Sequence, residues 1–164
     1  MSRLKKVWYS IVARELIRDY LGFIRASKMY EESLTEEIDE LEAFVGWGDR
    51  NQMSLQSPDG SFRTGDGKIE YHEGWSETDF TALNIDDDWE IARFITDNNL
   101  YRTRIMKLKP RECYSYHFDR TPRVHLAVDT HEHCFISINN VLQHVPADGN
   151  AYWIDTRQYH TAMN

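Results

Sequence analysis

Two histidines and one aspartate in the last third of the chain have a spacing that suits metal binding. His117 and Asp119 are two residues apart, and His160 follows near the end of the sequence. Alternate residues of a strand point to the same side, so a His-x-Asp pair can direct both side chains at one ion. Two histidines and one carboxylate, with other positions left open, are the ligand set of non-haem Fe(II) oxygenases. The alternative is that both histidines are ordinary half-buried residues and that Asp119 begins a turn before Pro122.

A strand is predicted over residues 123–129, and its two faces differ in chemistry. Apolar residues occupy positions 124, 126 and 128, which assigns that face to the core. The opposite face carries Arg123 and His125, and a strand interior seldom holds a charged side chain without a partner. One explanation is a structural salt bridge from Arg123 to an acid such as Asp155.

The sequence from about residue 100 onwards resembles the aspartyl/asparaginyl β-hydroxylase-like branch of the Fe(II)/2-oxoglutarate-dependent oxygenases, which includes small proline hydroxylases. Three blocks carry the resemblance in this order: residues 117–119, residues 123–126 and residues 149–164. The resemblance implies that His117, Asp119 and His160 are catalytic and bind Fe(II). It also implies that Arg123 and His125 contact the carboxylates of 2-oxoglutarate, a role that suits the planar fork of an arginine.

The implied activity is that of a dioxygenase that consumes O2 and 2-oxoglutarate and hydroxylates an unactivated C–H bond. Its substrate would be a free amino acid, such as proline, or the side chain of Asp, Asn or Pro in a peptide. Asp119 favours hydroxylation, because halogenating oxygenases of this kind lack the carboxylate. Two alternatives stay open: a cupin-type metal-dependent enzyme, or a non-enzymatic jelly roll that binds a small ligand or a protein partner.

The relatives bind the far carboxylate of 2-oxoglutarate with an arginine on the strand after the second metal-binding histidine. Here only residues 161–164 follow His160, and none of them is Arg or Lys. We therefore expect either that a longer chain supplies this arginine or that Arg102, Arg104 or Arg123 replaces it. Without the strand, a neighbouring sheet edge is expected to be exposed.

The predicted fold is mainly β with N-terminal helices (α+β), and the resemblance implies a double-stranded β-helix, or cupin-like jelly roll. Apolar residues at helical spacing predict an amphipathic helix over residues 4–24. A capping box that begins at Ser33 predicts a second helix to residue 45. A third helix is predicted over about residues 86–97, capped by Asn84 or Asp86. Strands are predicted at 53–56, 68–71, 101–108, 113–119, 123–129, 134–138, 141–145 and 150–155.

One oxygenase-like domain is predicted for residues 1–164, made of a helical buttress (1–45), a segment of loops, short strands and a helix (46–98) and a jelly-roll core (99–164). The aromatic content of 13% suits a β-rich core. The net charge of −8 argues against a nucleic-acid partner, and the chain has no apolar run of roughly 20 residues that could span a membrane. Two cysteines without a CxxC motif indicate reduced thiols in a cytoplasmic protein. Residues 51–60 are similar to small oxygenases of this kind encoded by bacterial viruses.

Several other polar and aromatic residues have weaker assignments. The His131-Glu-His133 segment could bind a metal, but an exposed turn is the prediction. Asp155 and Asn164 are predicted to hydrogen-bond the iron-binding histidines. Four aromatic residues are predicted to fill the core rather than line a pocket: Tyr114, Tyr116, Trp153 and Tyr159.

Overall fold

The computed structural model describes residues 8–15, 31–48, 50–67 and 74–164, and this part of the chain is α+β with antiparallel strand pairing. The helices are α1 (Glu31–Val45), α2 (Glu90–Asp97) and the short 3-10 helix η2 (Glu77–Asp79). The strands are β1 (Trp8–Glu15), β2 (Gln52–Ser54), β3 (Leu100–Leu108), β4 (Arg123–Asp129), β5 (Phe135–Ile138), β6 (Val141–Gln143), β7 (Ala151–Ile154) and β8 (His160–Met163).

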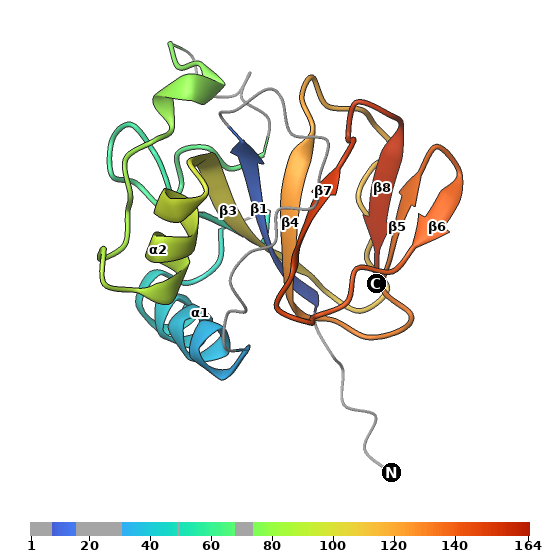
Figure 1. Ribbon diagram of the computed structural model, residues 1–164, viewed down its shortest axis with the longest axis horizontal. Helices are drawn as coiled ribbons and strands as arrows, with labels where there is room; N and C mark the ends of the chain where they lie inside the picture. Colours follow the sequence, from blue (N-terminus) through green and yellow to red (C-terminus); the bar gives the residue numbers. More distant parts are fainter. Residues whose placement is uncertain (1–7, 16–30, 49, 68–73) are drawn as a thin grey trace.

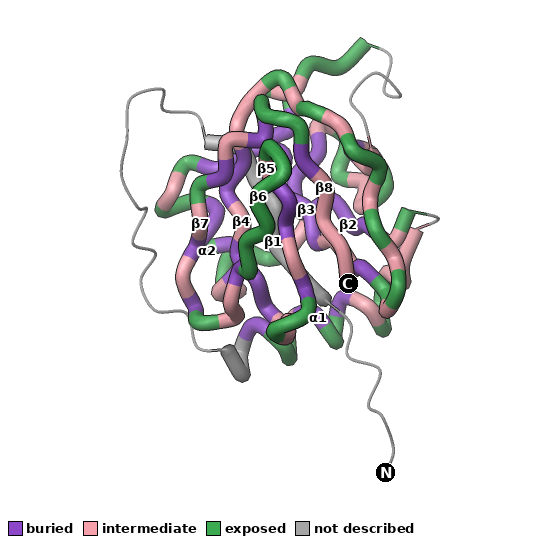
Figure 2. Tube along the Cα trace, turned by 90° about the vertical axis from the view of Figure 1, so that its right-hand side faces the viewer, coloured by how far each residue is buried: buried purple, intermediate pink, exposed green. Residues whose placement is uncertain are grey.

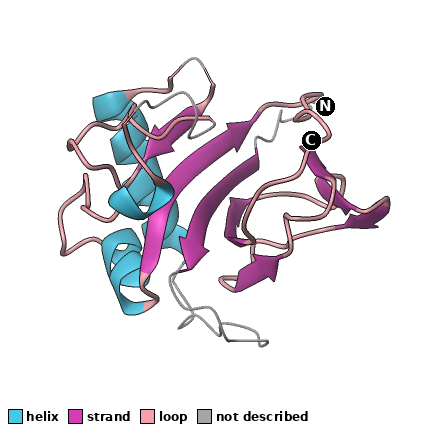
Figure 3. Ribbon diagram, turned by 90° about the horizontal axis from the view of Figure 1, so that it is seen from above, coloured by secondary structure: helices cyan, strands magenta, loops and turns pink. Residues whose placement is uncertain are grey.

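The strands form two sheets, one of five strands in the order β2-β3-β1-β4-β7 and one of three in the order β6-β5-β8. Both helices cover one side of the five-stranded sheet, and the three-stranded sheet lies on its other side (Figures 1 and 3). After β4 the chain enters the smaller sheet for β5 and β6, returns for β7 and crosses again for β8. Among the described residues these strands do not close into a jelly roll.

Two hydrophobic cores lie on the two sides of the five-stranded sheet, and β4 contributes to both. Val124, Leu126 and Val128 pack in the core under the helices. Ala127 packs in the core between the sheets, with Leu108 and Ile136. The two-faced strand predicted at 123–129 is therefore confirmed, and Arg123 and His125 share the Ala127 face by strand alternation.

The predicted N-terminal helix is wrong over residues 8–15, which form the strand β1. This strand lies between β3 and β4 and pairs antiparallel with both (Figure 1). Aromatic and β-branched residues in this segment suit a strand, and a short apolar run does not by itself distinguish helix from strand. Pairing on both edges favours the strand, because it satisfies the backbone hydrogen-bonding groups of β1 and joins β3 to β4. The remaining residues of the predicted helix, and the strand predicted at 68–71, lie outside the described residues.

The other two predicted helices exist, but their N-termini differ from the predicted ones. α1 begins at Glu31, so Ser33 lies inside the helix and cannot cap it. α2 begins at Glu90, and Glu37 of α1 accepts hydrogen bonds from the N–H groups of Glu90 (2.6 Å) and Ile91 (3.1 Å). A cap from another helix replaces the predicted local cap and anchors α2 on α1.

The predicted strand at 113–119 is reduced to isolated bridges that align this segment with β8. Cys113 pairs with Met163, and His117 pairs with His160. The other strands predicted from residue 100 onwards match β3 to β7 within one or two residues. The residues of β6, at the edge of the smaller sheet, are exposed, whereas those of β3 and β4 are largely buried (Figure 2). No helix in the described ranges is long and apolar enough to cross a membrane.

Candidate metal centre

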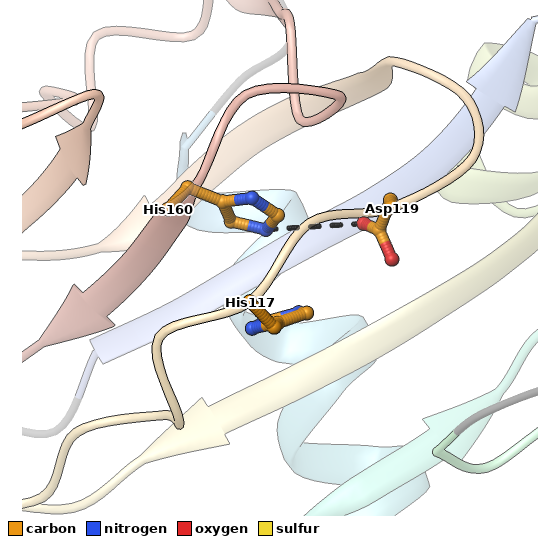
Figure 4. A group of neighbouring side chains, drawn as sticks. All are labelled: His117, Asp119 and His160. Carbon is orange, nitrogen blue, oxygen red and sulfur yellow. Dashed lines mark ion pairs between the residues drawn. The ribbon is translucent and has the colours of Figure 1, made fainter.

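His117, Asp119 and His160 come together in the folded chain, with one ligand atom from each lying within 4.8 Å of the other two (Figure 4). His160 Nε2 is 3.8 Å from Asp119 Oδ2, and the centroids of the two imidazole rings are 4.4 Å apart. Two backbone hydrogen bonds between His117 and His160, of 3.0 and 2.7 Å, fix the segments that carry them. The group could hold a metal ion.

Each histidine of this group uses its Nδ1 atom in a hydrogen bond to a backbone carbonyl. His117 Nδ1 is 2.6 Å from the Ser115 oxygen, and His160 Nδ1 is 3.0 Å from the Gln158 oxygen. A carbonyl can only accept, so Nδ1 carries the proton and the Nε2 atom of a neutral ring has a free lone pair. Burial lowers the pKa of His160 and so favours the neutral ring. This is the tautomer and support that a metal-binding histidine requires.

The predicted supports for these histidines, Asp155 and Asn164, have other partners. Asp155 pairs with Arg157 at 2.7 Å. Asn164 donates to the Leu108 carbonyl at 2.7 Å and accepts from His131. The prediction from proximity in sequence was wrong, because the carbonyl two residues before each histidine already occupies its Nδ1 atom.

Arg123 lies beside the metal group and pairs with one of its members. Its Nε donates to Asp119 Oδ2 at 2.7 Å, and the side chain is almost completely buried. The salt bridge from Arg123 to an acid that the sequence allowed is therefore present, but the acid is Asp119 and not Asp155, which pairs with Arg157. The Nη1 atom of Arg123 is buried and has no hydrogen-bond partner among the described residues.

Two further buried polar atoms belong to the same region between the sheets. His125 Nδ1 has no hydrogen-bond partner in the described part of the chain, and neither does the Tyr114 hydroxyl. Burial, with a smaller effect of the Arg123 charge, lowers the pKa of His125 to about 3, so this ring stays neutral. Burial also raises the pKa of Tyr114 to about 12, which keeps its hydroxyl protonated. The charge of Arg104 acts on both residues.

Tyr114 lies beside β8 and contributes to the core between the sheets. Its N–H donates to the Ala162 carbonyl, and its ring packs in the core between the sheets. Cys113 pairs with Met163 but His117 pairs with His160, so the register shifts by one residue between the two bridges. The core packing predicted for Tyr114 is confirmed, whereas Tyr116, Trp153 and Tyr159 are exposed, so the same prediction was wrong for them.

Arg102 and Arg104, two of the candidates for the arginine that binds the far carboxylate, contact the loop at residues 63–67. Arg102 pairs with Glu77 and donates to the Gly67 carbonyl at 2.8 Å. Arg104 donates to the same carbonyl at 2.9 Å and to the side chain of Gln52. Arg104 also acts electrostatically on His125 and Tyr114.

The second histidine group, at His131 and His133, has the opposite hydrogen bonding. The backbone N–H of His133 donates to His131 Nδ1 at 3.2 Å. His131 Nε2 therefore carries the proton of the neutral ring and faces Asn164 Oδ1 at 3.2 Å. Glu132 and His133 are exposed in a turn, as predicted.

Comparison with known proteins adds no family to this geometry. No family model matches the sequence, and a search of curated proteins finds no matching relative. What is established is a mainly antiparallel α+β structure in which a His-x-Asp…His group could hold a metal ion.

Proposed function

We propose that this protein is an Fe(II)- and 2-oxoglutarate-dependent dioxygenase, a hydroxylase of the aspartyl/asparaginyl β-hydroxylase-like branch. One observation carries the proposal. His117, Asp119 and His160 bring one ligand atom each within 4.8 Å of one another, and both Nδ1 atoms are bound to carbonyls, so the Nε2 atoms of neutral rings are the ones available to a metal. Two imidazoles and one carboxylate match the ligand set of the non-haem Fe(II) oxygenases.

The three residues fit a divalent ion chemically. Asp119 supplies negative charge, and the two histidines supply neutral nitrogen, the form in which imidazole binds metals. When bound, Fe(II) supplies the oxygen chemistry, in which O2 and 2-oxoglutarate are consumed and an unactivated C–H bond becomes C–OH. The protein residues orient the ligands and exclude water, and the partial burial of Asp119 and His160 suits that role.

A carboxylate of 2-oxoglutarate would be held by the buried donors next to the metal group. Arg123 Nη1 can donate to it, and so can His125 Nδ1 in the neutral tautomer that carries the proton there. The Tyr114 hydroxyl is a third donor in the same inter-sheet region. Buried donors without a partner are costly, and a bound anion would satisfy them.

The strand order supports a double-stranded β-helix as the finer description of the fold. The chain alternates between the two sheets from β4 to β8, and β1 lies at the centre of the larger sheet. The proposed substrate is an amino acid or the side chain of Asp, Asn or Pro in a peptide.

A cupin-type metal enzyme that does not use 2-oxoglutarate is the second candidate. It is favoured by the Arg123–Asp119 pair, which occupies the Nε atom of Arg123 and leaves less of its guanidinium for a cosubstrate. Succinate formation separates the two candidates, because only the first converts 2-oxoglutarate to succinate.

The test combines metal titration with turnover. The wild-type protein should bind one Fe(II) under anaerobic conditions and form succinate from 2-oxoglutarate in air. His117→Ala and His160→Ala should lose both properties, whereas His133→Ala, in the exposed turn, should keep them. Undiminished metal binding in both of the first two variants would exclude this metal site, and metal binding without succinate formation would favour the cupin-type alternative.

A further inference from the structure

Arg123 links the metal group to the proposed anion site through one guanidinium. Its Nε donates to Asp119 Oδ2 at 2.7 Å, and that oxygen is the atom that lies 3.8 Å from His160 Nε2. Its Nη1 is buried and without a hydrogen-bond partner among the described residues. The same cation therefore neutralises a candidate metal ligand on one side and presents an unused donor on another.

We propose that Arg123 is a positioning residue that couples metal binding to anion binding, with Asp119 as the switchable charge between them. Without metal, the Asp119 carboxylate neutralises Arg123 and repels a second carboxylate. With a divalent ion on Asp119, the carboxylate charge is compensated and the charge of Arg123 becomes available to the anion. This inference rests on the proposed function, since it assumes a metal on His117, Asp119 and His160 and a carboxylate ligand beside Arg123.

The local structure holds Asp119 and Arg123 in place, so the coupling between metal and anion acts through charge rather than through a conformational change. Asp119 and Arg123 are joined by a short turn, and Asp119 N–H donates to the Thr156 carbonyl at 2.8 Å. The Thr156 hydroxyl donates to the Thr121 carbonyl at 2.8 Å, and Thr156 is almost fully buried. Thr156 therefore holds the start and the middle of the turn, and Arg123 at its end is the first residue of the paired strand β4. Asp119 and Arg123 cannot easily separate, so a change of charge on one is felt by the other.

Burial strengthens this effect. Charges separated by a few ångströms interact several times more strongly in a partly buried site than in water. The side chains of Arg123 and Asp119 are 8% and 17% exposed, so water screens the pair only weakly. Coupling between two ligands typically changes affinity about 5- to 150-fold, and it must be equal in both directions. An anion bound at Arg123 should therefore also tighten the metal.

Measuring succinate binding to the metal-free protein tests the effect of Asp119 on Arg123 without any contribution from a metal–ligand bond. Succinate carries two carboxylates but no 2-oxo group, so it cannot chelate the metal as 2-oxoglutarate does. Asp119→Asn removes the negative charge and keeps an oxygen that accepts from Arg123 Nε. We expect metal-free Asp119→Asn to bind succinate about tenfold more tightly than the wild type does, although the same change weakens metal binding.

The experiment is isothermal titration calorimetry with succinate in the presence of a chelator, on the wild type, Asp119→Asn, Arg123→Gln and the double variant. The gain in Asp119→Asn should vanish in the double variant, because it depends on Arg123. Asp155→Asn is the matched control: it removes a carboxylate from another arginine pair, on the exposed Arg157, and should leave succinate affinity unchanged. Circular dichroism melts identify any variant that does not fold. If Arg123→Gln does not fold, Arg123→Lys, which keeps the charge, replaces it, and an intermediate loss of succinate affinity is expected.

A second arm adds Mn(II) in place of the chelator. Mn(II) should tighten succinate binding by about tenfold in the wild type and much less in Arg123→Gln. The inference is overturned if metal-free Asp119→Asn binds succinate no more tightly than the wild type does, or if it binds no detectable succinate. It is also overturned if the gain in succinate affinity from Asp119→Asn persists in the double variant that lacks Arg123. Failure of the wild type to bind any divalent ion would instead contradict the proposed function, and the metal-free comparison would still decide whether Asp119 restrains Arg123.

Discussion

The two histidine groups of this protein each combine two histidines with one acidic residue, but they differ in the atom that each ring presents. In the first group, His117 and His160 donate from Nδ1 to carbonyls two residues earlier. In the second, His131 accepts at Nδ1 from the backbone of His133. The first arrangement leaves Nε2 free to bind a metal, and the second puts a proton on it. The backbone partner of each ring therefore distinguishes the two groups as candidate metal sites.

The surroundings of the two groups reinforce this difference. The first has a partly buried carboxylate, Asp119, next to a buried arginine. In the second, Glu132 and His133 are 3.6 Å apart and have side chains that are 87% and 76% exposed, so water screens their interaction. A buried carboxylate with compensating partners can contribute to metal binding, whereas a solvated pair at a turn contributes little.

The largest expected effect comes from removing one histidine from each group in turn. His160→Ala should weaken Mn(II) binding by more than about 100-fold, since loss of even a hydrogen bond that supports a metal ligand typically costs 10- to 100-fold. His131→Ala should leave Mn(II) affinity unchanged. Calorimetric titration with Mn(II) measures both, and equal losses would show that the hydrogen-bonding difference does not select the metal site.

The next largest effect is a loss of stability at acidic pH, which we expect from the buried ring of His125. His125 has a pKa lowered to about 3 in the folded protein, mainly by burial, against an ordinary value of 6.5. Its stabilising contribution is present above about pH 6.5 and is lost as the pH falls, because the unfolded chain then takes up a proton that the folded chain refuses. At pH 5 this should lower the free energy of unfolding by about 2 kcal/mol.

His125→Gln should remove this part of the acid sensitivity, and His133→Gln, on an exposed side chain, should retain it. Urea denaturation at pH 7.5 and at pH 5 measures the difference. The same loss of stability in His125→Gln as in the wild type would mean that other groups cause the acid sensitivity.

A smaller effect is expected from the aromatic residues behind the metal group. Tyr159 stacks on Tyr116, with centroids 5.5 Å apart, and meets the edge of Phe118 at 5.4 Å. These rings connect the segment of His117 to that of His160. Tyr159→Ala should lose about 0.5–1.5 kcal/mol of pair energy and reduce Mn(II) affinity several-fold. Trp153→Ala, at an exposed ring on β7, is the control and should not change Mn(II) affinity.

The smallest effect on the metal is expected from Asn164, which connects to the second histidine group. Its side chain bonds His131 and the Leu108 carbonyl. Asn164→Ala should lower the free energy of unfolding by about 1 kcal/mol without a change in Mn(II) affinity. Metal titration of a folded Asn164→Ala protein checks this, and a clear loss of affinity would restore the role expected from the sequence.

The sequence by itself determined the features that depend on local periodicity. Alternation of residue types at 123–129 predicted the two faces of β4, and apolar spacing predicted α1. The His-x-Asp pair and the distant His160 were predicted to meet, and they do meet, because β8 aligns with the segment before Asp119. The inferences on β4 and α1 succeed because each strand or helix repeats its own geometry wherever it is placed, whereas the meeting with His160 was implied by the family resemblance.

Tertiary structure decided the features that depend on partners distant in the chain. Residues 8–15 form a strand because β3 and β4 offer an edge on each side, which outweighs a helical pattern. Glu37 caps α2 from another helix. Arg123 pairs with Asp119 because a turn anchored by Thr156 brings them together. The sequence specifies which groups can form such contacts, but the choice among them is made by the packing of both sheets at once, because each contact gains its energy only when its distant partner is already in position.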